Sequence, residues 1–232
     1  MIRGWEGFSA RFVCIVVCLT STVSSCGRSP RTPYNGDPAV PLFELNTADY
    51  CKPQQSKDYS EDLISISGEK PDGSYGFAQG GGCIKRSILD AWGVLHNQDL
   101  MKWDGVTKMS FKKGEPPKKT THFYEVRYVV SDILTVRWTM QWYHTVGFGT
   151  REAPQLLWVN YKRVAGDPNV DYWEGTIYLQ EVEPGVTAFA MRDQIHRDLD
   201  PRDPNDSLEN SSKGSVSDVF GKVKTGQSVP IP

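Results

Sequence analysis

Two polar side chains lie on otherwise apolar strand faces and could perform acid–base chemistry. His144 shares one face of a period-two stretch with Trp138, Met140 and Trp142. Asp193 shares its face with Phe189, Met191 and Ile195. A histidine and a carboxylate can act as acid–base partners when they approach within about 3 Å or share one water. The same pattern also suits a hydrogen-bonded histidine at the rim of a strand, so no catalytic residue is assigned.

Sequence signatures of the common enzyme classes are absent. The chain contains no GxSxG, P-loop, GxGxxG or HExxH motif. It also has no CxxC or HxxxH spacing, and its four histidines are scattered along the sequence. We therefore expect no metal ion and no cofactor. A binding protein is favoured over an enzyme, and a cyclase- or hydrolase-like activity of polar cavity residues is the alternative.

Alternation of apolar and polar residues predicts the strands that position these side chains. Two extended segments are expected at 62–67 and 75–84. Six more are expected at 106–112, 121–131, 133–146, 155–165, 171–183 and 186–197. The breaks between them are turn sequences such as GFGTREAP and EPG. Apolar residues at helical spacing predict a helix over 84–95, followed by a short helical turn over 98–103.

The inner faces of these strands supply a candidate apolar cavity. Ligand pockets are mostly apolar, with a few polar groups that orient the ligand. The candidate ligand-binding residues are Tyr124, Tyr128, Trp138, Met140, Trp142, His144, Phe189, Met191 and Asp193. The alternative is that the apolar members of this set simply form the core of the domain.

Composition limits the class of partner. Lys and Arg number 26 against 28 Asp and Glu, which gives a net charge of −2. The chain therefore lacks the excess positive charge that is typical of proteins that bind nucleic acid. The 232 residues suffice for one domain with a sizeable core. Seven tryptophans and an aromatic content of 11% indicate a large apolar interior or an aromatic-lined cavity.

The first residues of the chain have the pattern of an export signal. A positively charged start precedes an apolar run, 12–19, that is shorter than the roughly 20 residues of a membrane span. Val-Ser-Ser-Cys at 23–26 resembles the lipobox of bacterial lipoproteins. That resemblance implies acylation of Cys26, and Gly27 after it favours the outer membrane facing the periplasm. The alternative is an ordinary secreted protein with an unmodified cysteine.

The chain divides into four regions by composition. A signal peptide, 1–25, is followed by the lipidated cysteine and a flexible tether, 26–60, rich in Pro, Gly and polar residues. The folded domain is expected over 61–197, and a polar loop with a short helix over 198–232. Cys51 and Cys83 are left as an even pair, which allows one disulfide in an oxidising compartment; two free thiols are the alternative.

Two stretches resemble the START-like helix-grip superfamily (SRPBCC), which includes polyketide cyclases, START lipid-transfer domains and the birch-pollen-allergen family. CIKRSILDAWGVLHNQDLMKW, at 83–103, is similar to the first helical region of that family. YWEGTIYLQEVEPGVTAFAMRDQI, at 172–195, is similar to its final hairpin. The resemblance implies an α+β fold with a curved antiparallel sheet of about seven strands and two short helices after the first strand. The chain departs from the family at its end, where a polar loop and a short helix over 216–223 replace the long C-terminal helix.

The resemblance also implies a function, because cavities in this superfamily hold lipids, polyketides or other hydrophobic molecules. We therefore expect a lipid-anchored cell-envelope protein that binds or carries a hydrophobic ligand and attaches to the membrane through its N-terminal lipid. A structural or interaction protein of the envelope, with a filled core, is a further hypothesis.

Overall fold

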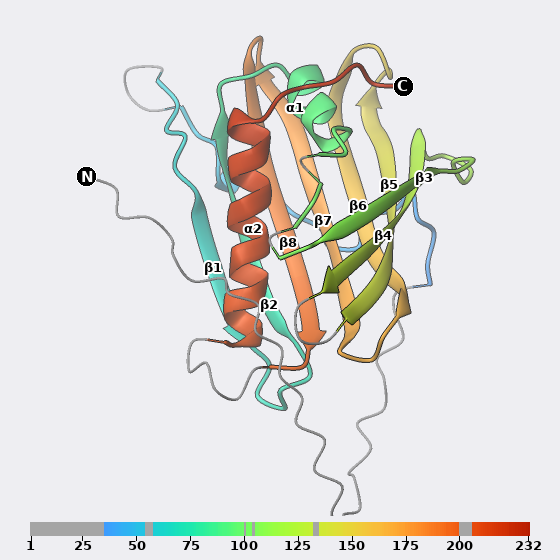
Figure 1. The fold of residues 1–232 in the computed structure, drawn as a ribbon. Helices are drawn as coiled ribbons and strands as arrows, with labels where there is room; N and C mark the ends of the chain where they lie inside the picture. The colour runs from blue at the N-terminus through green and yellow to red at the C-terminus, as the bar shows by residue number, and fades with distance from the viewer. Residues whose placement is uncertain (1–34, 54–57, 100, 104, 132–134, 200–205) are drawn as a thin grey trace, which may run out of the picture.

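Eight strands form one antiparallel sheet that curves around a long helix (Figure 1). The strands are β1 (Ile64–Glu69), β2 (Gly76–Ile84), β3 (Lys108–Lys113), β4 (His122–Ser131), β5 (Thr135–Gly149), β6 (Pro154–Gly166), β7 (Val170–Glu183) and β8 (Val186–Arg197). Their order across the sheet is β1-β2-β8-β7-β6-β5-β4-β3.

The computed structural model describes residues 35–53, 58–99, 101–103, 105–131, 135–199 and 206–232. The expected signal peptide, the lipobox-like sequence and Cys26 lie outside these ranges.

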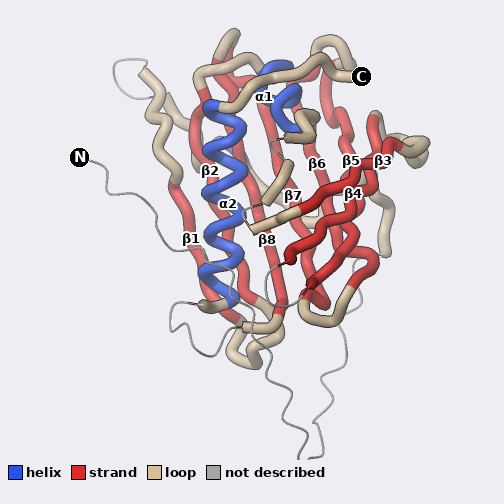
Figure 2. Tube along the Cα trace, in the orientation of Figure 1, coloured by secondary structure: helices blue, strands red, loops and turns tan. Residues whose placement is uncertain are grey.

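Two α-helices lie on the concave side of the sheet (Figure 2). The longer one, α2 (Leu208–Thr225), packs on β1, β2 and β8. The shorter one, α1 (Ile88–Leu95), contacts β6, β7, β8 and the longer helix. A 3-10 helix, Thr47–Asp49, precedes the first strand. None of the helices in the described ranges is long and apolar enough to cross a membrane.

Alternation along the strands decides which side chains enter the interior. In β4, Tyr124 and Tyr128 are buried while Arg127 is exposed. Tyr124 lies opposite Trp142 of β5, and Tyr128 lies opposite Trp138. Directly opposed residues of an antiparallel pair project from the same face of the sheet. The aromatic rings of these two strands therefore gather on the concave side.

The predicted strands are confirmed in order and type, and the sheet has eight of them rather than about seven. The first helix begins at Ile88, later than expected, because Ile84 is the last residue of β2. Ser87 caps this helix by accepting a hydrogen bond from the Asp90 amide at 3.1 Å. The short helical turn expected over 98–103 is a hydrogen-bonded turn in its described residues, where the Met101 amide donates to the carbonyls of Asn97 and Gln98 at 3.2 Å, and it does not extend into a helix.

The C-terminal helix is the largest correction to the sequence-based fold. A polar loop followed by a short helix over 216–223 was expected, whereas α2 runs from Leu208 to Thr225. Polar residues at its start concealed the helical period, because buried serines face the sheet there. Ser211 and Ser215 donate from their hydroxyls to helix carbonyls one turn back, at 2.8 and 3.1 Å. A serine face can therefore be buried without unsatisfied hydroxyls at these two positions.

Part of the expected tether is instead packed on the convex face of the sheet. The amide nitrogen of Asn160 in β6 donates to the carbonyls of Pro38 and Val40, at 3.0 and 2.7 Å. Its amide oxygen accepts from the Leu42 amide at 3.2 Å. Residues 37–53 therefore do not form a free linker, because these hydrogen bonds attach the segment to the middle of the sheet.

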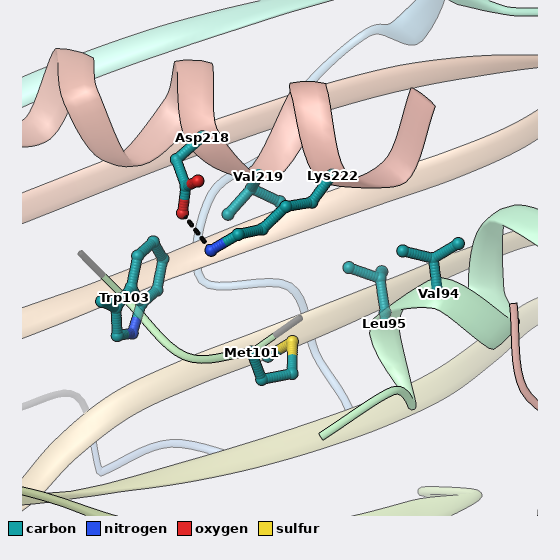
Figure 3. Close-up of a pocket in the computed structure, with 7 residues that line it drawn as sticks. All are labelled: Val94, Leu95, Met101, Trp103, Asp218, Val219 and Lys222. Carbon is teal, nitrogen blue, oxygen red and sulfur yellow. Dashed lines mark hydrogen bonds and ion pairs between the residues drawn. The ribbon is translucent and has the colours of Figure 1, made fainter. Parts of the chain in front are cut away.

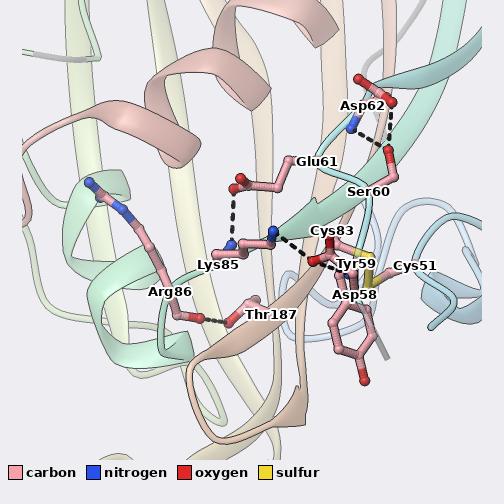
Figure 4. The surroundings of a disulfide bond; sticks show 10 residues. All are labelled: Cys51, Asp58, Tyr59, Ser60, Glu61, Asp62, Cys83, Lys85, Arg86 and Thr187. Atoms are coloured by element: carbon pink, nitrogen blue, oxygen red, sulfur yellow. Dashed lines mark hydrogen bonds and ion pairs between the residues drawn. A yellow bond between two sulfur atoms is a disulfide. The ribbon is translucent and has the colours of Figure 1, made fainter. Parts of the chain in front are cut away.

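A disulfide fixes the end of that segment. Cys51 is bonded to Cys83 of β2, with Cα atoms 4.8 Å apart (Figure 4). Both cysteines are buried beside Tyr59. The bridge ties the N-terminal segment to β2, the strand next to the β1 edge of the sheet.

Candidate functional site

The nine candidate ligand-binding residues all lie on the concave face or at its end, and all are buried. Each exposes 5% of its surface or less: Tyr124, Tyr128, Trp138, Met140, Trp142, His144, Phe189, Met191 and Asp193. The alternation of the strands therefore selected interior positions correctly. Their packing divides them into an aromatic cluster, a buried carboxylate and a group of histidines.

The aromatic cluster has Trp103 at its centre. The ring of Trp103 lies 5.0 Å from that of Trp173 and 6.4 Å from that of Trp142, centre to centre. Trp138 lies 6.1 Å from Trp173 and stacks at 5.4 Å on Tyr128. Trp103 comes from the loop between α1 and β3, and Trp173 comes from β7. Neither was among the sequence-based candidates.

Several polar atoms of this cluster are buried without a partner. Within the described part of the chain, the indole N–H groups of Trp103, Trp138 and Trp142 donate no hydrogen bond that meets normal geometry. The nearby Tyr128 hydroxyl donates weakly to the Met101 carbonyl at 3.4 Å. Burial raises the pKa of Tyr128 above its usual range, while the indoles of Trp103 and Trp142 oppose that shift. The cluster is thus apolar in surface but contains unused N–H donors.

A small pocket opens beside Trp103, between the two helices (Figure 3). It is lined by Val94, Leu95, Met101, Trp103, Asp218, Val219 and Lys222. Lys222 and Asp218 form an ion pair at its edge, with Nζ and Oδ2 2.5 Å apart. The pocket volume is about 10 Å³, roughly the space that one water occupies. Side chains therefore fill this part of the interior.

The buried carboxylate of Asp193 accepts hydrogen bonds from the sheet and faces serines of α2. The Trp173 indole donates to Oδ1 at 2.8 Å, and the Tyr161 hydroxyl donates to the same oxygen. Ser212 and Ser215 of the helix lie close enough to favour its charged form. Burial outweighs these donors and raises the pKa of Asp193 to about 7. Its second oxygen, Oδ2, and the Ser212 hydroxyl have no hydrogen-bond partner among the described residues.

The acid–base hypothesis for His144 and Asp193 is contradicted by the geometry. Trp142, two residues before His144, belongs to the row of paired positions that continues through Tyr161 and Gly175 to Asp193. Three strand spacings of about 4.8 Å each, or roughly 14 Å in total, separate β5, which carries His144, from β8, which carries Asp193. The described contacts of His144 are with Trp92 and its neighbouring rings, and they do not include the carboxylate.

Three of the four histidines meet at one end of the concave face, which the sequence did not reveal. His96 at the end of α1 lies 4.4 Å from His144 and 4.7 Å from His122, between ring centres. Burial lowers the pKa of His96 to about 3, and it also lowers the pKa of His122 and of His144. The three rings are therefore neutral at pH 7. Among the described residues, no group of His, Cys, Asp and Glu has the arrangement of a metal site.

The sheet order, the long helix on its concave face and the short helix after β2 have the arrangement of a helix-grip fold. No family model and no curated protein sequence matches the chain.

Several solved structures are similar at low sequence identity. The lipid transfer domain of human StarD13 is 10% identical, with a TM-score of 0.48, over 73% of this chain and 86% of that domain. A STAR-related lipid transfer protein from Xanthomonas axonopodis is 14% identical, with a TM-score of 0.45, over 73% and 96%. The Zhui aromatase/cyclase from Streptomyces sp. R1128 is 12% identical, with a TM-score of 0.39, over 70% and 94%. At these identities the likeness concerns the fold alone.

Proposed function

We propose that the protein is a binding module that holds a hydrophobic molecule between α2 and the concave face of the sheet. The observation that carries this proposal is the aromatic cluster beside the opening between the two helices. Apolar ligand surface buried against such a lining contributes about 25 cal/mol per Å². The unused indole N–H groups would donate to an acceptor atom of the ligand.

Binding requires space, and Trp103 is the side chain that would provide it. The other rings of the cluster belong to strands whose backbones are paired on both sides, whereas Trp103 belongs to a loop. It is covered by Lys222, whose Nζ lies 5.6 Å from the ring centre and donates to the Lys102 carbonyl at 2.9 Å. Outward movement of this loop would open the pocket toward Trp142 without disturbing the sheet.

The proposal includes a lipid anchor at Cys26 in a bacterial cell envelope, on the outer membrane facing the periplasm. Its support is the lipobox-like sequence at 23–26 and the disulfide between Cys51 and Cys83, a bond typical of oxidising compartments. Substitution of Cys26→Ser should move the protein from the membrane fraction to the soluble fraction and remove the mass of the acyl chains. Equal membrane association of both forms would contradict the anchor.

A second candidate function is that of an interaction protein with a permanently filled core. The observation that favours it is the small volume of the pocket, about 10 Å³. In that case the outer surfaces would bind another envelope protein, and no hydrophobic molecule would enter.

Uptake of a dansyl-labelled fatty acid separates these functions. Energy transfer from tryptophan to the dansyl group should saturate with the added probe, and Trp103→Ala should accelerate uptake severalfold because the loop no longer fills the opening. Trp158→Ala is the matched control, since Trp158 packs against Tyr178 on the convex face, with ring centres 6.2 Å apart. Absence of saturable transfer in the wild type and in Trp103→Ala would favour the filled core.

A further inference from the structure

The three-histidine cluster, His96, His122 and His144, contains unused hydrogen-bonding capacity. The side chains come from α1, β4 and β5, and they expose 6%, 3% and 1% of their surface. Each ring has one nitrogen with a partner and one that is buried without any among the described residues: His96 Nε2, His122 Nδ1 and His144 Nε2. A buried polar atom left without a hydrogen bond destabilises the fold. Three such atoms in one place indicate a site that an additional group completes.

The partners that are present fix the proton positions on two of the rings. The Trp92 indole can only donate, and it donates to His144 Nδ1 at 2.9 Å. The neutral ring of His144 therefore carries its proton on Nε2. The Pro232 carbonyl can only accept, and it lies 2.8 Å from His122 Nε2. The proton of His122 is consequently on Nε2, so its Nδ1 presents a lone pair.

The third ring adapts to either role. His96 Nδ1 lies 2.7 Å from the Tyr124 hydroxyl, which can both donate and accept. The cluster thus presents one donor at His144, one acceptor at His122 and one adaptable nitrogen at His96. The cluster does not suit a carboxylate, because a carboxylate cannot donate to the lone pair of His122. It does not suit a metal ion, because the free nitrogen of His144 carries a proton.

We propose that the three-histidine cluster binds the hydroxyl group of an amphipathic alcohol, accepting its proton at His122 Nδ1 and donating to its oxygen from His144 Nε2. The centres of these two rings are 6.0 Å apart. Burial keeps the rings neutral, so recognition depends on the direction of the hydrogen bonds and not on charge.

The cluster adjoins the proposed apolar site on one side. Tyr124, which contacts His96, lies opposite Trp142 in the sheet, and Trp142 stacks on Trp103. This inference therefore rests on the proposed function, because the alkyl part of the alcohol would lie in the aromatic cluster. The inference specifies the expected ligand as an alcohol rather than a fatty acid.

On the other side, the segment 226–232 covers the cluster and runs over α1 (Figure 1). The Pro232 carbonyl that holds His122 also accepts from Arg151. Arg151 and Ile231 line a groove of about 640 Å³ on the surface. The groove therefore exposes the outer side of the covering segment to solvent.

The experiment uses the full chain labelled with 15N-histidine, in which nitrogen chemical shifts distinguish protonated from unprotonated ring nitrogens. The probes are 1-decanol and decyl methyl ether, which differ in the hydroxyl donor. Decanol should shift the signals of His144 Nε2 and His122 Nδ1 and bind about tenfold more tightly than the ether, the effect of one lost hydrogen bond. His122→Phe should abolish this preference, because it removes the acceptor of the hydroxyl proton that only decanol carries. His196→Gln should retain it, because His196 pairs with Asp171 outside the cluster.

Three outcomes would overturn the inference. The first is a wild-type spectrum in which His122 Nδ1 is protonated, since this measurement does not depend on any variant folding. The second is that both probes bind with equal affinity, as measured by tryptophan fluorescence, and leave the histidine signals unchanged. The proposed function would then stand without the histidine subsite. The third is binding of neither probe, which would contradict both the subsite and the proposed function.

Discussion

The Tyr161 hydroxyl crosses Gly175 to donate its hydrogen bond to Asp193. The three residues occupy one row of paired positions on β6, β7 and β8. A tyrosine side chain reaches the next strand but one because the residue between them has no side chain. The glycine therefore positions a buried carboxylate, although it makes no polar contact of its own.

Replacing that glycine should test the row directly. In Gly175→Ala, the added Cβ would overlap the Tyr161 hydroxyl and approach the Arg192 carbonyl at 2.6 Å. We expect a loss of roughly 1–3 kcal/mol in unfolding free energy, measured by urea denaturation. Gly214→Ala in α2 is the control, because nothing lies within 4 Å of its Cβ, and it should stabilise by roughly 0.5–1 kcal/mol. Equal effects of both substitutions would contradict the crossing.

Asp193 should make stability fall as the pH rises. Its pKa is about 7 in the fold against 3.8 for the ordinary group. The folded state therefore binds the proton of Asp193 more tightly than the unfolded state does. The stabilisation that this proton gives the fold is complete below pH 3.8 and is lost as the pH rises to about 7. The difference in unfolding free energy between Asp193→Asn and the wild type should change by on the order of 1–3 kcal/mol between pH 4.5 and 7.5. A pH-independent difference would show that the carboxylate is not perturbed.

The histidines should act in the opposite direction. Burial lowers the pKa of His96 from 6.5 to about 3, so the unfolded chain binds its proton first as the pH falls. Stability should be full above pH 6.5 and decrease toward pH 3, by up to about 1.4 kcal/mol per pH unit for each such ring. Chemical denaturation of His96→Gln should show a shallower acid slope than the wild type. An acid slope in His96→Gln equal to that of the wild type would contradict neutral burial of this ring.

Alternation predicted the sheet and the nine interior positions because each strand buries one face. It also places Tyr161 inward, on the same face as Leu157 and Val159, so this partner of Asp193 could have been found. The three-histidine cluster could not, because it depends on where the end of α1 places His96 relative to β4 and β5. Trp103 lies in a loop without periodicity, and the serine face of α2 gave no apolar repeat.

The disulfide should stabilise the domain mainly through the unfolded chain. Cys51 and Cys83 are 32 residues apart, and closing a loop of this length is worth roughly 3–4 kcal/mol in the chain-entropy model. The double variant Cys51→Ser/Cys83→Ser should melt at least several degrees lower. A reductant should lower the melting temperature of the wild type and leave that of the variant unchanged. Identical melting with and without reductant in the wild type would contradict a stabilising bridge.

Native mass spectrometry of the full chain purified from its own cell envelope tests the central claim most directly. Gentle activation should release a discrete hydrophobic molecule from the wild type. The same mass should be lost in Trp142→Ala, which remains folded by circular dichroism, and retained in Trp158→Ala. A wild-type protein that carries no such mass, and that also fails to take up the dansyl-labelled fatty acid, would contradict a ligand-binding function.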